Sequence, residues 1–306
     1  MDDVHVTDLG DDLYLIDAMM EDEPHRLACY LFDTPERVLV ECGPSRSIEH
    51  LFRALDHVGV DDVAVMAVTH IHIDHAGGAG HFARRYPNAR IGVHTKGARH
   101  LVSPDRLWDS ACRVFGEQDL LDSWGPMEPI DEGRVLVLDE GDRIPLGGGR
   151  FVDVMYTPGH AKHHLVYHEA SSGAAFVGDA VGLAFPHGHM TVQPGTPPPD
   201  FDPDLLVDSL HRIGEREPSF LGFAHFGLAT DPRSTLAEAE ERVRSWVSWV
   251  EASDLEGNAL ADALRDWVLG EYRRQGYSEE VIGAYDRSAQ WGSQTAGILR
   301  WMALRG

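Results

Sequence analysis

The chain has 306 residues, enough for one large or two modest domains with a substantial core. Its 50 acidic and 26 basic residues give a formal net charge of −24, which argues against a partner bound through a nucleic-acid backbone. Three widely spaced cysteines match no zinc ribbon or disulfide scaffold and indicate buried thiols in a reducing compartment. No basic leader or apolar run of ~20 residues is evident, so we expect a cytoplasmic protein without a membrane partner.

The first third of the chain has the pattern of a layered α/β fold. Strands are predicted over four apolar or alternating segments, 4–6, 13–16, 27–32 and 37–40. An amphipathic helix is predicted over 47–57, followed by the apolar run 63–68, which is typical of a buried strand. A helix over 77–86 and a strand over 90–94 continue the alternation. This order favours strands and helices in separate layers.

Four side chains that can bind metal follow the apolar run directly. His70, His72, Asp74 and His75 fall within six residues. If the backbone stays extended beyond the run, the first two histidines point to the same side, because strand side chains alternate. Imidazoles with a carboxylate are suitable ligands for zinc, iron or another divalent transition metal. We therefore predict a metal site here.

The pattern His-x-His-x-Asp-His after an apolar strand resembles the metallo-β-lactamase superfamily. Three later motifs follow in the order of that family, and they are Thr157-Pro158-Gly159-His160, Phe176-Val177-Gly178-Asp179-Ala180 and Phe223-Ala224-His225-Phe226-Gly227. The resemblance covers residues 4 to 230. It implies two metal sites, the first formed by His70, His72 and His160, the second by Asp74, His75 and His225, with Asp179 as the bridge.

The resemblance also implies the fold and the chemistry. We expect an αββα sandwich as the catalytic domain over 1–230 and a helical C-terminal extension over 231–306. The cofactors would be two divalent ions, zinc first and iron or manganese as alternatives. A hydroxide bridging them, oriented by the catalytic Asp74, would attack an ester, thioester, lactone or amide of a small molecule. Glu41 stands where the family often has aspartate, and we expect it beside the ligands.

The branch of the family stays open. Asp179 favours the glyoxalase II and lactonase branches over the β-lactamases. However, 180–185 contains no Lys or Arg for glutathione, and Gly182 stands where acyl-homoserine lactonases often have Tyr. The alternative function is that of a mononuclear iron oxidoreductase of the persulfide dioxygenase kind. A nuclease is disfavoured by the acidic charge.

Four further features each leave more than one interpretation. The aromatic-rich insertion 96–129 either packs on the core or forms a lid over the substrate. The loop 183–203, with His187 and His189, either shapes the pocket or is inert. His163 is expected to be exposed or beside the ligands, with a role in substrate binding or proton transfer as the alternative. Helices are predicted over 237–250, 259–273 and 279–304, as an appendage, a pocket wall or a homodimer surface.

The acidic, lysine-poor composition yields a prediction on salt. Only Lys96 and Lys162 are lysines, so the protein comes either from a halophilic cytoplasm or from an ordinary GC-rich genome. Surface repulsion acts over about 30 Å at low salt and about 3 Å at molar salt. We expect the melting temperature of the metal-saturated protein to rise from low to molar potassium chloride at fixed pH. A flat or falling curve would contradict the halophilic interpretation.

Overall fold

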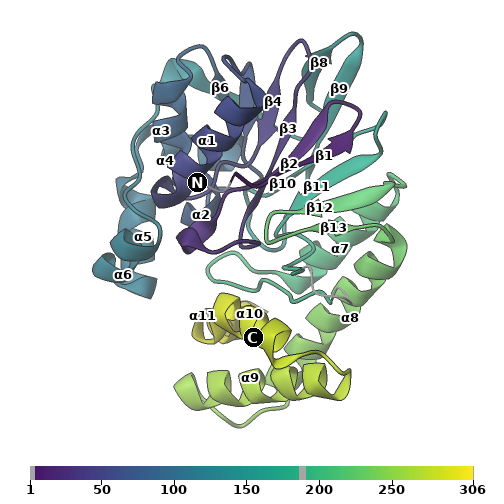
Figure 1. The fold of residues 1–306 in the computed structure, drawn as a ribbon. Helices are drawn as coiled ribbons and strands as arrows, with labels where there is room; N and C mark the ends of the chain where they lie inside the picture. Colours follow the sequence, from purple (N-terminus) through teal and green to yellow (C-terminus); the bar gives the residue numbers. More distant parts are fainter. Residues whose placement is uncertain (1–3, 186–190, 306) are drawn as a thin grey trace.

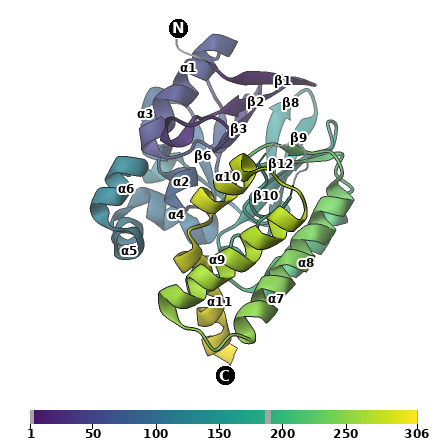
Figure 2. The same cartoon turned by 60° about the horizontal axis from the view of Figure 1, so that its bottom comes forward.

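The structure is a computed structural model that describes residues 4–185 and 191–305 (Figure 1). Two β-sheets pack face to face, and helices cover their outer faces (Figures 1 and 2). This confirms the predicted αββα sandwich with helices after it. His187 and His189 lie outside the described residues. Among the helices of the described ranges, none has both the length and the apolar composition that crossing a membrane requires.

The first sheet has seven strands that follow one another in chain order. They are β1 (Val6–Gly10), β2 (Leu13–Asp17), β3 (Ala28–Phe32), β4 (Val38–Val40), β5 (Val65–Ala67), β6 (Arg90–His94) and β7 (Val135–Leu138). Strands β1 to β4 pair antiparallel, and β4 to β7 pair parallel. Parallel neighbours need a crossover, which α1 (Ile48–Val58) supplies between β4 and β5, and α3 (Ala79–Arg85) between β5 and β6.

The second sheet has the order β13-β12-β11-β10-β9-β8 among the described residues. Its strands are β8 (Arg143–Gly147), β9 (Arg150–Tyr156), β10 (Leu165–Glu169), β11 (Ala174–Gly178), β12 (Phe220–Phe223) and β13 (Leu228–Ala229). Strands β11 and β12 are parallel, connected through α7 (Pro203–Gly214), and β9 runs in the same direction as β11 because both pair antiparallel with β10.

The core between the sheets contains aromatic side chains from both of them. The rings of Tyr30 and Phe176 lie 4.6 Å apart, and both side chains are buried. Tyr30 also donates its hydroxyl hydrogen to the Phe223 carbonyl at 2.8 Å, so a polar atom in the core is satisfied across the two sheets. Cys29 and Cys42 are buried as predicted, whereas Cys112 is only partly buried.

The insertion between β6 and β7 is helical and lies at one end of the sandwich (Figure 1). It contains α4 (Thr95–Val102), α5 (Asp105–Phe115) and α6 (Glu117–Ser123). Every residue of α5 keeps some exposure to solvent, although the helix is strongly amphipathic. This explains why Cys112, on α5, is not fully buried as the sequence predicted.

The C-terminal segment contains four helices rather than the three predicted. They are α8 (Pro232–Glu251), α9 (Gly257–Arg274), α10 (Glu279–Ala289) and α11 (Trp291–Arg305). The predicted helix over 279–304 is interrupted at Gln290, which is left-handed with φ 49° and cannot continue a right-handed helix. The division at residue 230 stays a prediction, because these helices share one hydrophobic cluster with the two sheets.

Gly297 lets α11 approach the loop that follows residue 190. A Cβ at this position would overlap the backbone oxygen of Thr196. We expect Gly297→Ala to destabilise the protein by about 1–3 kcal/mol, because backbone cannot move aside as a flexible side chain can. The matched control is Gly292→Ala on the same helix, where a Cβ would meet nothing within 4 Å. Thermal unfolding of both variants tests this, and equal melting temperatures would contradict it.

Candidate metal centre

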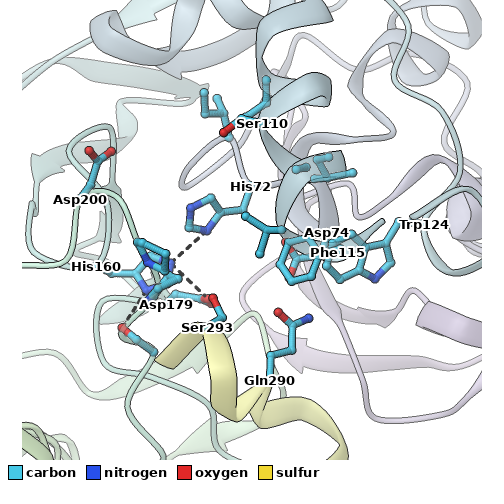
Figure 3. A pocket seen from close by; sticks show the side chains of 18 of the residues that line it. His72, Asp74, Ser110, Phe115, Trp124, His160, Asp179, Asp200, Gln290 and Ser293 are labelled. Carbon is cyan, nitrogen blue, oxygen red and sulfur yellow. Dashed lines mark hydrogen bonds and ion pairs between the residues drawn. The ribbon is translucent and has the colours of Figure 1, made fainter. Parts of the chain in front are cut away.

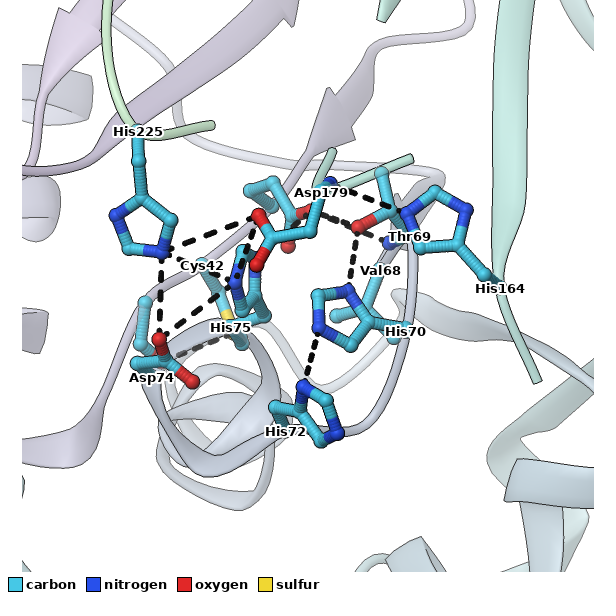
Figure 4. A network of polar contacts seen from close by, with 12 residues as sticks. Cys42, Val68, Thr69, His70, His72, Asp74, His75, His164, Asp179 and His225 are labelled. Atoms are coloured by element: carbon cyan, nitrogen blue, oxygen red, sulfur yellow. Dashed lines mark hydrogen bonds and ion pairs between the residues drawn. The ribbon is translucent and has the colours of Figure 1, made fainter. Parts of the chain in front are cut away.

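The seven predicted ligands converge at one edge of the sandwich; Figure 4 shows six of them and Figure 3 shows His160. They follow strand ends: His70 to His75 come after β5, His160 after β9, Asp179 after β11 and His225 after β12. Because β9, β11 and β12 run in one direction, their carboxyl ends meet at the same edge of the second sheet. The loop after β5 faces them from the first sheet. The fold therefore assembles residues separated by up to 155 positions along the chain.

The first group contains His70, His72 and His160. The His72 Nδ1 atom lies 2.8 Å from His70 Nε2 and 3.1 Å from His160 Nε2. Two of these rings form a hydrogen bond through the nitrogen that points away from the group. His70 Nδ1 pairs with the Thr69 hydroxyl at 3.0 Å, and His160 Nδ1 pairs with the Gly195 carbonyl at 3.0 Å. Strand β5 ends at Ala67, earlier than predicted, but the two early histidines still face the same point.

The second group contains Asp74, His75 and His225. Asp74 and His75 lie on α2 (Ile73–Ala76), a single helical turn that follows His72. The His225 Nε2 atom is 3.2 Å from both His75 Nε2 and Asp74 Oδ2. The Arg26 carbonyl accepts a hydrogen bond from His225 Nδ1 at 2.8 Å, which leaves Nε2 directed at the group.

Asp179 lies between the two groups. Its Oδ1 atom is 3.5 Å from His75 Nε2, and its Oδ2 atom is 3.6 Å from His160 Nε2. Glycine at position 178 allows the backbone to place Asp179 between the groups. Its φ of +47° is unfavourable for other residues, and a Cβ there would lie 2.7 Å from His164 Nε2. One carboxylate therefore presents a separate oxygen to each group of histidines.

The residues present fit divalent transition metals. Imidazole nitrogens of both groups converge within hydrogen-bonding distance of one another, while the outer nitrogens of four of the histidines, His70, His75, His160 and His225, are already bonded. Asp179 Oδ1 is buried and has no hydrogen-bond partner within the described residues. Outward bonding of ring nitrogens and inward lone pairs are what metal-binding histidines require. The histidine-rich groups could thus hold metal ions.

The two groups differ in protonation. Burial lowers the pKa of His70, His72 and His160, that of His72 to about 4, so these rings are neutral. In the second group burial also favours neutral rings, but the charges of Asp179 and Asp74 outweigh it and raise the pKa of His75 well above its usual value. The pKa of His225 is raised in the same way. The second group thus holds protons in the metal-free protein.

Glu41 lies beside the site. Its Oε1 atom accepts hydrogen bonds from the Thr69 backbone N–H at 3.3 Å and from the Thr69 hydroxyl, and it is 3.3 Å from His75 Nδ1. The side chain is fully buried. Glu41 therefore orients both the loop after β5 and one predicted ligand.

Two histidines near His160 are more closely involved than the sequence indicated. His163 is buried, 6 % exposed, which corrects the expectation that it could be exposed. Its Nδ1 atom accepts from the Ile71 N–H at 3.4 Å. No role of His164 was predicted from its place in the sequence, yet its Nε2 atom accepts a hydrogen bond from the Asp179 N–H at 3.2 Å. The short spacing to His160 was the available signal, but the contact with Asp179 is set by the pairing of β10 and β11.

A cavity of about 430 Å³ opens in front of the two groups (Figure 3). The insertion contributes Ser110, Phe115 and Trp124 to its wall, so the insertion lines the pocket. The described part of the loop 183–203 also lines it. Gln290 and Ser293, from the C-terminal helices, form the opposite side. The C-terminal segment is therefore a pocket wall, one of the three interpretations left open above.

Comparison with known proteins agrees with this geometry. The profile described as metallo-beta-lactamase superfamily matches residues 26–225, about two thirds of the chain. The chain belongs to the metallo-β-lactamase superfamily. A metallo-beta-lactamase fold-containing protein of Sulfurisphaera tokodaii is 33 % identical over 197 residues, which are 63 % of this chain and 69 % of that protein.

Two further relatives of this chain are named as enzymes. A hydroxyacylglutathione hydrolase of a Synechococcus strain is 27 % identical over 60 % of this chain, and an acyl-coenzyme A thioesterase of Homo sapiens is 28 % identical over 56 %. The matches span 57 % and 64 % of those relatives.

Among solved structures, an archaeal superfamily protein from Sulfolobus tokodaii has a TM-score of 0.67 at 27 % identity, covering 94 % of this chain and 98 % of that one. A metallo-beta-lactamase family protein from Thermus thermophilus has a TM-score of 0.71 at 20 % identity, covering 98 % of this chain and 95 % of that one, and it supports the fold alone.

Proposed function

We propose that this chain is a dinuclear metal-dependent hydrolase that cleaves an ester, thioester, lactone or amide bond of a small molecule. The first ion would be held by His70, His72 and His160, and the second by Asp74, His75 and His225. The observation that carries the proposal is the position of Asp179, whose two carboxylate oxygens face different groups.

Two bound divalent ions would supply a water of lowered pKa and positive charge for the oxygen that becomes negative in the transition state. The residues of the chain would orient the attacking water and exclude bulk water. The Asp74 Oδ2 atom lies 3.2 Å from His225 Nε2 at the edge of the site, and Asp74 would orient the attacking water. Burial of His70 and His160 excludes bulk water from the inner side, so substrate would enter from the cavity in front of the ligands.

The relatives named as hydrolases support the acyl-transfer class. The hydroxyacylglutathione hydrolase and the acyl-coenzyme A thioesterase both act on acyl groups by their names. Zinc is the first candidate for the metal, with iron or manganese as alternatives. A mononuclear iron oxidoreductase of the persulfide dioxygenase kind remains the second candidate function, and metal stoichiometry separates it from the first.

The test is elemental analysis of metal-replete protein, followed by assays on ester, thioester, lactone and phosphodiester panels. We expect close to two transition-metal ions per chain and turnover of at least one acyl substrate. A reproducible content near one iron per chain, with oxidation of a persulfide and no hydrolysis, would reject the dinuclear hydrolase.

A further inference from the structure

The pocket in front of the predicted ligands is basic although the protein is strongly acidic. Acidic residues outnumber basic ones by 50 to 26 in the chain, but the described residues lining the pocket include six arginine or lysine side chains and four carboxylates. Two of these carboxylates, Asp74 and Asp179, belong to the predicted metal site, where cations would neutralise them. The six cationic residues are Arg26, Arg99, Arg106, Arg113, Lys162 and Arg287.

Three of the six are already paired with acidic side chains, and these are Arg26, Lys162 and Arg287. Arg99, Arg106 and Arg113 form no salt bridge with any residue in the ranges 4–185 and 191–305. Within the described part of the chain, the Arg99 guanidinium makes one hydrogen bond, from its Nε atom to His100 Nε2 at 3.2 Å. Other arginines of the described ranges also lack acidic partners, but these three line one pocket, where an anion from outside the chain could pair with them.

The helices of the insertion place these three arginines at one wall of the pocket. Arg106 and Arg113 are seven residues apart on α5, and Ser110 lies between them on the same face. All three residues line the pocket, and Figure 3 shows Ser110 on the opposite side of His72 from Gln290. Arg99 reaches the same wall from α4.

We propose that the arginine cluster, defined as Arg99, Arg106 and Arg113, binds a carboxylate or phosphate group of the substrate. The inference rests on the proposed function and deepens it, since it makes the substrate an anionic ester or thioester. Guanidinium groups pair with both anions through two parallel hydrogen bonds, which gives orientation as well as affinity. A cavity of about 430 Å³ is large enough for a reacting group at the metal site and an anionic group at the cluster.

The arginine cluster also affects how an anionic substrate would approach this acidic protein. A net charge of −24 repels an anionic substrate at long range, and repulsion of this kind slows association. Positive charge confined to the pocket wall reverses the potential where the substrate must enter, so an acidic protein can still take up an anion.

The test compares two triple variants of the metal-loaded protein that change the net charge equally. One is Arg99→Gln/Arg106→Gln/Arg113→Gln, and the control is Arg90→Gln/Arg233→Gln/Arg274→Gln, whose residues are exposed and outside the pocket. The substrates carry one acyl group on three carriers: neutral pantetheine, 4′-phosphopantetheine for phosphate, and glutathione for carboxylate. They are assayed at one ionic strength.

We expect the cluster variant to lose at least tenfold in kcat/KM on the phosphate or the carboxylate thioester, since each charge-assisted bond is worth about that much. Its kcat/KM on the neutral thioester should change less than twofold, and the control variant should match the parent protein. The arm that responds identifies the anion. Equal losses on neutral and anionic thioesters, or no loss, would overturn the inference.

A binding measurement keeps the inference separate from the proposed function. Calorimetry uses non-hydrolysable S-ethyl thioethers of the same three carriers, which need no catalysis. If no thioester is hydrolysed but an anionic thioether binds the parent at least tenfold more tightly than the cluster variant, the proposed function fails and the anion site stands. Equal affinity of parent and variant for both anionic thioethers would overturn the anion site.

Discussion

Replacing Asp179 with alanine is expected to remove both the bound metal and the hydrolytic activity. The carboxylate presents Oδ1 at 3.5 Å from His75 Nε2 and Oδ2 at 3.6 Å from His160 Nε2, so one substitution affects both groups. Without its charge, two cations would stand close together with no anion between them. Metal content should fall from near two ions to below one per chain. Activity should fall by more than about a hundredfold, since outer contacts of metal ligands alone are worth 10–100-fold.

The measurement is elemental analysis and the initial rate after gel filtration of the variant. Asp208→Ala is the matched control, because Asp208 is exposed on α7 and does not line the cavity at the site. His163→Ala is a stricter control, because His163 is buried beside the ligands but its Nδ1 faces the Ile71 N–H. Both controls should keep their metals. Full metal occupancy in Asp179→Ala would show that this residue does not bridge.

Lowering the pH is expected to release metal from the second group before the first. In the metal-free protein the pKa of His75 is raised well above its usual 6.5, and that of His225 is also raised, so both rings carry protons near neutral pH. A metal needs the lone pair that this proton occupies, so binding must expel it. Affinity therefore rises with pH and falls as pH decreases, about tenfold per pH unit for each proton expelled.

The first group behaves differently because burial lowers the pKa of His70, His72 and His160. These rings are neutral throughout the range near neutrality, so binding there expels no proton until the pH approaches the lowered values. At pH about 6 the metal content should approach one ion per chain, and at pH about 8 it should approach two.

Competitive metal titrations at several pH values measure this difference. Calorimetry in buffers with different ionisation enthalpies gives the protons expelled by each ion. We expect proton release from one binding event and little from the other. Loss of both ions with the same pH slope would contradict the assignment of protonated and neutral groups.

The sequence by itself determined which residues compose the candidate centre. His70 to His75 are close together in the chain, and the motifs around His160, Asp179 and His225 each follow an apolar strand. Such signals are local, because strand and turn patterns need only a few neighbouring residues. The same local patterns predicted most strands and a layered α/β architecture, whereas the family resemblance implied the sandwich fold, which the structure confirms. That these residues bind metal stays a prediction.

Only the tertiary structure decided how the surroundings of these residues are arranged. The contact of Glu41 with His75 and that of His164 with the Asp179 N–H depend on strands that pair far from one another in sequence. The break at Gln290 allows the C-terminal segment to turn and face the pocket. No periodicity of the chain encodes such contacts, because they result from packing between elements.

The arginine cluster is the clearest example of this division. Its three arginines have no local pattern that distinguishes them from the others in the chain. The sequence shows that the protein is acidic overall. A net charge for the whole chain does not say where the individual charges lie in the folded protein. The fold places these three arginines at one wall of one cavity. The electrostatic potential at that wall depends on the charges within about a Debye length of it, and only the tertiary structure decides which charges those are.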